Sequence, residues 1–437
     1  MSSTNKSELS RRSFTKKVTA GAAALGLSQI TFPSLLAANP ANNVKLKVGV
    51  VGLGGRGNGA VNDILSADPN TELWAVGDIF ESRVKRVQGL KKKFGGRVST
   101  GDGEREFVGF DSFQKVIDSG VDIVLLTSTP AFRPQHFEAA IAAGKHVFME
   151  KPFALDVPGV LRVVETSKKA EQAGLSVLTG LVWRYSDQLM ELHKRVQDGA
   201  IGEIISTTSS YCGGGRPNQM PDPKFKPPGM TDMEWAMRYW QNLLEFSGDG
   251  ALEFMIHGID RMAWAMDDQL PVHCFASGGN IKPLKGSNNW DSFHMNFEYA
   301  NGSTATFMGR QIRGTFAASG DIIHGTKGRA VVAGKNAYIE RDGKRVWEKS
   351  SGLGYGREHE IFTKHIRQGK VYNDVSKGMA NSHLVALMGR TAAYTGQLIR
   401  DKQLLASKDV LFATEGMNFE TPFTARETAL QGVTKFV

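Results

Sequence analysis

The fold is decided by the segment Lys45-Leu-Lys-Val-Gly-Val-Val-Gly-Leu-Gly-Gly-Arg-Gly57. Its first half is a β-branched run that predicts a buried strand, and apolar positions at helical spacing after it predict a helix. Between them lies G-x-G-x-x-G, which in this strand-to-helix context predicts a dinucleotide-binding turn. Gly52 permits the tight turn, Gly54 lets the backbone approach a pyrophosphate, and Gly57 allows close packing of helix on strand. Arg56 lies inside this fingerprint, and we include it among the predicted nucleotide contacts.

The second predicted strand, 73–78, ends in Asp78. An acid at about this distance from the glycines accepts the ribose hydroxyls and repels a 2′-phosphate, which favours NAD over NADP. Asp78 could instead be an ordinary strand-end residue that makes a turn, but the preceding fingerprint favours the ribose role. Arg83, in the charged segment that follows, keeps NADP open.

A third strand, 121–126, ends in small hydroxyl residues that would let a cofactor pass close to the backbone. These residues could also cap the helix predicted over 132–143, and the two roles are compatible. The predicted cofactor contacts from this region and from the next strand end are Thr127, Ser128, Thr129, Pro130, His136 and Glu150.

The next strand ends in Lys-His-Val-Phe-Met-Glu-Lys-Pro, residues 145–152. The proline favours an extended backbone at Lys151 and ends the strand there. Because this strand belongs to the series begun by the fingerprint, its carboxyl end should face the cofactor. Taken alone, a Lys-Pro after a strand is more often a solvated turn.

The alternation of strands and helices predicts a Rossmann-type, doubly wound parallel sheet over 44–170. From there to 437 the chain is predicted to form an α+β domain with a large, mostly antiparallel sheet, because alternating β-rich segments follow one another with turn signals such as Ala300-Asn-Gly. The Gly/Pro-rich loop 213–229 interrupts this domain and is too long for a mere connection, which is typical of loops that line sites.

A second group of polar residues lies on a helix predicted within 248–264. Its apolar residues repeat at helical spacing, while Glu253, His257 and Asp260 fall on another face at i, i+4 and i+7. A Glu–His pair at i, i+4 can orient an imidazole for general-base catalysis. The alternative is a solvated helix face, but the strongly apolar neighbours argue against it.

The glycine fingerprint, the Ala-Gly-Lys-His-Val-Phe-Met-Glu-Lys-Pro strand and the acid-x-x-x-His helix together resemble the Gfo/Idh/MocA family, over nearly all of the chain after residue 43. The resemblance implies hydride transfer between a sugar or polyol carbon and a nicotinamide. It implies that Lys151 and His257 are catalytic, with His257 as acid/base and Lys151 stabilising the alkoxide. Glu253 stands where the family usually has Asp, and Met255 where it has Gly.

In the same reading Glu253 orients His257 and Asp260 supports the site. Three further residues are predicted to contact the sugar, each with packing as the alternative: Arg184, Tyr211 and Trp240. The resemblance also implies a homo-oligomer, a dimer or tetramer.

The amino-terminal region 1–43 contains Ser-Arg-Arg-Ser-Phe-Thr-Lys at 10–16, followed by an Ala/Gly-rich apolar segment. This pattern predicts a twin-arginine signal read by the twin-arginine export machinery, and hence a periplasmic protein exported after folding. A protein that folds before export acquires its nucleotide in the cytoplasm, so NAD is expected to be carried with it and tightly bound. Part of the formal net charge of +9 lies in this region, and the remainder shows no basic run, so a nucleic-acid partner is not indicated.

Export leaves two other functions open. Without a free NAD pool, a bound cofactor could oxidise a sugar transiently and be restored in the same cycle, allowing glycoside cleavage or isomerisation without net redox change. The second alternative is a non-catalytic sugar-binding protein.

We predict that the two cysteines, Cys212 and Cys274, are free and buried, and that no metal is bound, since no Cys/His cluster has ligand spacing.

Overall fold

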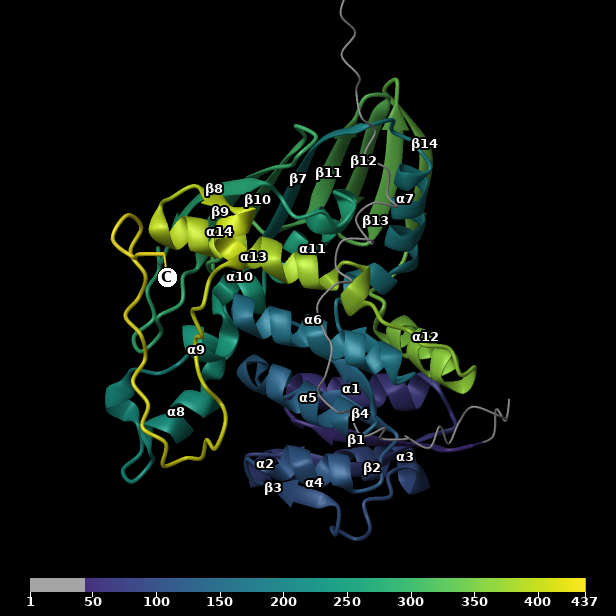
Figure 1. Cartoon of the computed structure of the whole chain (residues 1–437), viewed down its shortest axis with the longest axis vertical. Helices are drawn as coiled ribbons and strands as arrows, with labels where there is room; N and C mark the ends of the chain where they lie inside the picture. The colour runs from purple at the N-terminus through teal and green to yellow at the C-terminus, as the bar shows by residue number, and fades with distance from the viewer. Residues whose placement is uncertain (1–43, 437) are drawn as a thin grey trace, which may run out of the picture. The chain divides into compact units, whose positions relative to one another are not determined.

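The computed structural model describes residues 44–436, and the predicted twin-arginine signal lies outside them. The fingerprint opens a six-stranded parallel sheet with the strand order β3-β2-β1-β4-β5-β6. Figure 1 labels β1 to β4 of this sheet in the lower part of the view. The strands of the sheet are β1 (Leu46–Val51), β2 (Thr71–Asp78), β3 (Glu106–Val108), β4 (Ile123–Leu126), β5 (His146–Met149) and β6 (Val177–Thr179). The strand order reverses between β1 and β4, as in a doubly wound sheet, so the predicted fold class is confirmed. The sheet nevertheless takes β6 from beyond the predicted boundary at residue 170.

Helices connect these strands, and the longer ones each bury an apolar stripe against the sheet. They are α1 (Gly55–Ala67), α2 (Glu81–Val84), α3 (Val87–Phe94), α4 (Ser112–Asp118), α5 (Arg133–Ala142) and α6 (Val157–Gln172). Asp156 caps α6, because its carboxylate accepts a hydrogen bond from the Gly159 N–H at 2.8 Å. Because the strands are parallel, the β1–α1 turn and the carboxyl ends of β4 and β5 meet at one edge of the sheet.

The second half of the chain forms a nine-stranded sheet with the order β14-β13-β12-β11-β7-β10-β9-β8-β15. All neighbours are antiparallel except β7 (Ile204–Gly213) and β10 (Thr304–Gln311), so the predicted mostly antiparallel sheet is confirmed. The other strands are β8 (His273–Gly279), β9 (Ser292–Glu298), β11 (Ala318–Gly325), β12 (Gly328–Ala333), β13 (Asn336–Arg341), β14 (Lys344–Ser350) and β15 (Ile399–Arg400).

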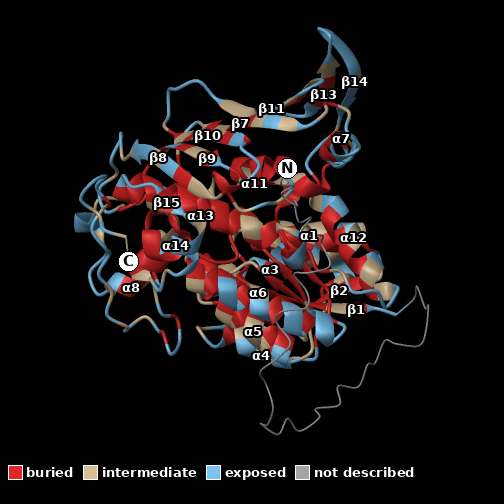
Figure 2. Cartoon of the chain, turned by 45° about the horizontal axis from the view of Figure 1, so that its top comes forward, coloured by how far each residue is buried: buried red, intermediate tan, exposed pale blue. Residues whose placement is uncertain are grey.

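Two helices, α11 (Ile256–Ala265) and α13 (Met379–Thr395), cover one face of this sheet. Along β10 the side chains of Ala305 and Phe307 are buried beneath them, whereas Thr304 and Met308 are exposed on the other face. Figure 2 shows buried residues concentrated where α11 and α13 lie. Cys212 and Cys274 are free and buried, as predicted.

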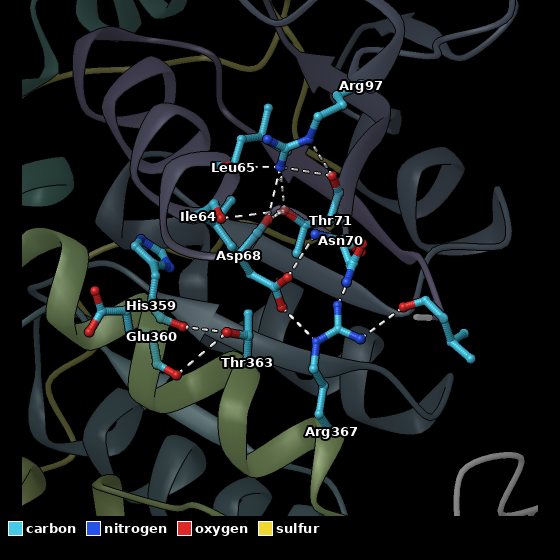
Figure 3. A network of polar contacts seen from close by, with 11 residues as sticks. Ile64, Leu65, Asp68, Asn70, Thr71, Arg97, His359, Glu360, Thr363 and Arg367 are labelled. Carbon is cyan, nitrogen blue, oxygen red and sulfur yellow. Dashed lines mark hydrogen bonds and ion pairs between the residues drawn. The ribbon is translucent and has the colours of Figure 1, made fainter. Parts of the chain in front are cut away.

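A later segment returns to the parallel sheet. Helix α12 (Tyr355–Arg367) packs on α1, and its last residue, Arg367, donates hydrogen bonds to the Asp68 carboxylate and to two backbone carbonyls of the first domain (Figure 3). Beyond it, the backbone at Tyr372–Asp374 pairs with the outer edge of β6. Within the described residues, no helix has the length and apolar character needed to cross a bilayer.

Candidate functional site

A cavity of about 780 Å³ lies at the carboxyl ends of the parallel strands, which is where doubly wound sheets bind ligands. It is lined by residues from the β1–α1 turn, from the ends of β2, β4 and β5, and from α10 (Asp249–Glu253), α11 and α12. The cavity therefore brings the two groups of residues predicted from the sequence to one place.

The glycine turn has the shape that a pyrophosphate requires. Gly52 has a φ of +91°, and a Cβ there would lie 2.6 Å from the Ser128 backbone nitrogen. A Cβ on Gly57 would lie 1.9 Å from the Gly52 carbonyl oxygen, so only glycine allows α1 to approach β1 this closely. Gly54 lines the cavity, and a Cβ there would meet no atom within 4 Å. The space in front of Gly54 at the start of α1 therefore fits the phosphates of a dinucleotide.

Asp78 lines the same cavity at the end of β2. Its Oδ2 accepts the Leu53 N–H at 2.8 Å and its Oδ1 accepts the Phe80 N–H at 3.0 Å. Burial raises the pKa of this carboxyl, which these two hydrogen bonds and the nearby Arg83 and Arg86 oppose. The carboxylate thus holds the glycine turn in place as well as facing the predicted ribose position.

The hydroxyl residues after β4 divide into two groups. Thr127 lines the cavity and donates from Oγ1 to the Gly52 carbonyl at 2.6 Å, which fixes the turn; Ser128 and Thr129 also line it. Pro130 does not line the cavity and instead begins a 3₁₀ turn (Pro130–Phe132) that leads into α5.

His136 lines the cavity beside these hydroxyls. The ring is stacked on Phe113 with centroids 4.1 Å apart, and its Nδ1 lies 3.1 Å from the Ser128 Oγ. Burial, with a smaller contribution from Arg133, lowers the pKa of His136 to about 3. The ring is therefore neutral at physiological pH, and it lines the cavity while sharing a hydrogen bond with the Ser128 hydroxyl.

Arg56 is engaged by carboxylates rather than left free for phosphate. It donates to Glu150 at 2.5 Å and to Asp63 at 2.8 Å, and the Tyr355 ring lies 4.6 Å from its guanidinium carbon. Glu150 is buried, and a Cβ on Gly180 would lie 2.8 Å from its carboxyl carbon. Arg56 and Glu150 line the cavity and together fix the strand end that presents Lys151.

Lys151 and His257 both line the cavity, on opposite domains. The Lys151–Pro152 peptide is cis, and the Lys151 Nζ donates to the backbone carbonyl of Glu253. That carbonyl is available because α10 ends at Glu253 and α11 begins at Ile256. His257 is half-buried, its ring centroid is 6.0 Å from that of Tyr211, and burial, then Lys151 and Arg261, lower its pKa well below 6.5. The imidazole is therefore a neutral base.

The Glu253 carboxyl does not orient His257, which corrects the sequence-based expectation. Its Oε1 accepts from Gln241 Nε2 at 3.1 Å, and its Oε2 is buried with no partner among residues 44–436. The expected single helix is interrupted between α10 and α11, so the i, i+4 relation does not bring the two side chains together. Met255 lies in this interruption and packs against Gly309 of β10, where glycine leaves room for it.

Arg184, predicted to contact the sugar, and Asp260, predicted to support the site, lie away from the cavity and pair with each other. Arg184 and Asp260 form a buried ion pair at 2.8 Å, which Asp268 and Ser382 complete, and neither lines the cavity. Tyr211 packs near His257 without lining the cavity, whereas Trp240 does line it.

Several cavity residues were missing from the sequence-based prediction. Arg133 is buried on α5, lines the cavity and donates to the Pro152 carbonyl at 2.5 Å, while burial lowers its pKa to about 10. Gln241 and Tyr355 come from segments with no motif of their own. Only Arg133 had a signal in the sequence, since it opens the helix that comes after the hydroxyl residues at the end of β4, one 3₁₀ turn further on.

Comparison with known proteins agrees with this architecture. Residues 46–178 match the model of an oxidoreductase family with an NAD-binding Rossmann fold, and residues 189–331 match the GFO/IDH/MocA C-terminal domain. Myo-inositol 2-dehydrogenase of Thermotoga maritima is 30% identical over 166 residues, which are 38% of this chain and 45% of the relative. Inositol 2-dehydrogenase 3 of Saccharopolyspora erythraea is 28% identical over 247 residues, 56% of this chain and 60% of the relative. The matches thus span about half the length of these relatives.

Solved structures share the fold over most of their length. Aldose–aldose oxidoreductase from Caulobacter crescentus gives a TM-score of 0.64 at 18% identity, covering 82% of this chain and 99% of that one. Levoglucosan dehydrogenase, solved with NADH and levoglucosan, gives 0.62 at 18% identity with the same coverage. Both domains and the nucleotide-binding turn lead to one conclusion: the chain belongs to the Gfo/Idh/MocA family of oxidoreductases and carries its NAD-binding Rossmann domain.

Proposed function

We propose that this protein is an NAD-dependent dehydrogenase of a sugar, a sugar derivative or a polyol. The observation that carries the proposal is that Lys151 and His257 line the same cavity as the glycine turn and Asp78. The inositol dehydrogenases among the relatives support the substrate class.

The residues present fit the nucleotide. Gly52, Gly54 and Asp78 would hold its pyrophosphate and ribose, and NAD, when bound, supplies the hydride acceptor. The hydroxyl residues that follow β4 would line the path between the glycine turn and Lys151.

His257 and Lys151 divide the proton chemistry in this proposal. The Nδ1 of His257 is buried without a partner among the described residues, so we assign Nε2 as the base that accepts the substrate's hydroxyl proton. Lys151 has three N–H donors and gives one to the Glu253 carbonyl. The others can stabilise the alkoxide that forms as the proton leaves.

The test measures NADH formation at 340 nm against a panel of polyols, aldoses and anhydrosugars. We expect NADH to accumulate with product, and the Lys151→Met and His257→Asn variants each to lower kcat by about 10²–10⁴-fold. Lys145→Met and His294→Asn are matched controls, since neither residue lines the cavity. Sugar conversion without stoichiometric NADH would replace net oxidation with the redox-neutral reaction. Unchanged rates in both site variants would remove the proposed roles.

We also propose that the protein is exported to the periplasm with its nucleotide bound and forms a dimer or tetramer there. The twin-arginine pattern at 10–16 supports export, and the exposed sheet face that carries Phe275 and Met308 supports association. A monomeric mass by light scattering at micromolar concentration would contradict the assembly. Unprocessed protein retained in the cytoplasm would contradict export.

A further inference from the structure

The loop 213–229 borders two cavities, the large one of about 780 Å³ and a small one of about 140 Å³. Three segments of the chain line the small cavity, and three of the lining residues are cations, whereas none of those described is Asp or Glu. Because one water takes about 30 Å³, the small cavity has room for an ion or for one group of a larger molecule, and not for a whole sugar or nucleotide. Its lining residues are Gly215, Arg216, Gln219, Lys282, Leu284, Gln311, Ile312 and Arg313.

The positive charges of Arg216, Lys282 and Arg313 are unmatched within the described part of the chain. Arg216 is buried, and its guanidinium donates only to neutral groups, the Ser287 hydroxyl at 3.0 Å and the Asn289 carbonyl at 3.3 Å. Among residues 44–436, neither the Lys282 ammonium nor the Arg313 guanidinium has a hydrogen-bond or ion-pair partner. A concave space lined by one sign of charge concentrates ions of the opposite sign, so the small cavity favours an anion.

The side chain of Gln311, the last residue of β10, indicates which kind of anion fits. Gln311 is 9% exposed, and its Oε1 is buried without a partner among the described residues. A buried acceptor without a hydrogen bond is costly, and a donor in the small cavity would satisfy it. Hydrogen phosphate has an O–H donor for this amide and charged oxygens for the guanidinium groups. Sulfate and chloride have no such donor.

Arg216 also connects the small cavity to the large one through hydrogen bonds. The Ser287 hydroxyl that accepts from Arg216 donates in turn to the Asn242 carbonyl at 2.7 Å. The Asn289 side chain donates to the Gln241 carbonyl at 3.0 Å, and Gln241 lines the large cavity. An anion that fixes the Arg216 guanidinium therefore also fixes the support of this wall of the large cavity.

The loop carries residues of both cavities within five positions. Gly215, Arg216 and Gln219 line the small cavity, while Pro217 and Asn218 between them line the large one. An anion held between Arg216 and the other two segments would restrain the backbone that presents Pro217 and Asn218.

We propose that Arg216, Lys282 and Arg313 bind phosphate, as the free ion or as the phosphomonoester group of a larger molecule, and that the bound phosphate fixes the loop 213–229 beside the large cavity. The inference goes beyond the dehydrogenase function and does not depend on it. Failure to oxidise any sugar would leave the phosphate site standing, and loss of the phosphate site would leave the dehydrogenase function standing.

The test is titration calorimetry of inorganic phosphate into the full chain with NAD⁺ saturating, because the glycine turn itself can bind phosphate. We expect one phosphate per chain with a Kd of about 1 mM or below, and sulfate at equal ionic strength to bind about threefold or more weakly. Lys282→Gln and Arg313→Gln should each weaken phosphate by about tenfold or more. Lys285→Gln is the matched control: it removes a cation from the same segment without lining the small cavity, and it should leave the Kd unchanged.

Hydrogen exchange of the loop amides is the second measurement, and it requires no activity. We expect saturating phosphate to slow exchange within 213–229 by about fivefold or more, and to have no such effect in Arg313→Gln at the same concentration. Glycerol 1-phosphate distinguishes the two sources: tighter binding than inorganic phosphate assigns the site to a phosphomonoester, and weaker binding assigns it to the free ion. No phosphate binding with NAD⁺ present, equal Kd values in the cavity variants and the control, or binding that leaves loop exchange unchanged would overturn the proposal.

Discussion

At the scale of single residues, Gly54 and Gly57 of the nucleotide turn have separate roles, one in nucleotide binding and the other in stability. We expect Gly54→Ala to keep the melting temperature and to lose NAD affinity by about tenfold or more, because its methyl group would occupy only cavity space. Gly57→Ala places a methyl group against the Gly52 carbonyl and should cost about 1–3 kcal/mol of stability. Thermal unfolding and nucleotide titration of both variants distinguish the two effects. Equal melting temperatures would contradict this assignment.

The neutral state of His257 makes a prediction about pH. Because burial, then Lys151 and Arg261, lower the pKa of the imidazole below 6.5, the base form persists as the pH falls through 6.5. We expect protonation of His257 to cause no fall in kcat/KM for alcohol oxidation between about pH 8 and about pH 6. A pH–rate profile checks it. A rate that falls with a midpoint at or above 6.5, and loses that midpoint in His257→Asn, would contradict the prediction.

Much of the site is visible in the sequence because its residues sit in local motifs. Gly52, Asp78 and Lys151 each lie at or just beyond the carboxyl end of a strand of one sheet, and parallel strand ends must meet at one edge. Arg184 and Asp260 could not be judged in this way, since only packing shows that each is the other's partner. Gln241 and Tyr355 carry no local pattern and reach the cavity only through the tertiary fold.

At the scale of elements, α12 stabilises the contact with α1 through one side chain. Arg367, mostly buried, pairs with Asp68 at 2.7 Å and donates to the Val44 and Asn70 carbonyls (Figure 3). We expect Arg367→Ala to lower the free energy of unfolding by about 2 kcal/mol, since it leaves the buried Asp68 carboxylate without its cation. Arg357→Ala, which removes an exposed pair with Glu360 on the same helix, should cost less than about 0.5 kcal/mol. Urea titrations that give the two variants equal losses in the free energy of unfolding would contradict this prediction.

The helix expected over 248–264 shows the limit of periodicity. The apolar repeat correctly marks the buried side, because Leu252, Ile256 and Ile259 are all buried. It does not reveal the interruption after Glu253, which depends on Met255 fitting against Gly309 from a strand that comes later in the chain. A pattern within one segment has no information about that distant glycine.

At the scale of the whole molecule, Asp374 joins the two halves of the chain. Its carboxylate accepts the Thr179 N–H of β6 and the Tyr185 hydroxyl at 2.6 Å, and burial raises its pKa from 3.8 to about 7. The folded chain thus holds this proton more tightly than the unfolded chain. The resulting stabilisation is complete below pH 3.8 and is lost as the pH rises through 7.

We therefore expect the stability of the unaltered protein, relative to Asp374→Asn, to fall between about pH 4 and pH 7. Urea unfolding of both proteins at several pH values measures this difference, and other titrating groups cancel in the comparison. Parallel stability curves would show that Asp374 stays ionised in the folded state.

The pairing of Tyr372–Asp374 with β6 also sets an order of events on the ribosome. Thr179 and Asp374 are separated by 195 positions, so the outer edge of the parallel sheet, β6, is synthesised long before the segment Tyr372–Asp374 that pairs with it. At about 5–20 residues per second, that edge waits roughly 10–40 seconds for its partner. Open strand edges are templates for unwanted pairing between chains, and this interval is when a nascent chain of this protein most needs a chaperone.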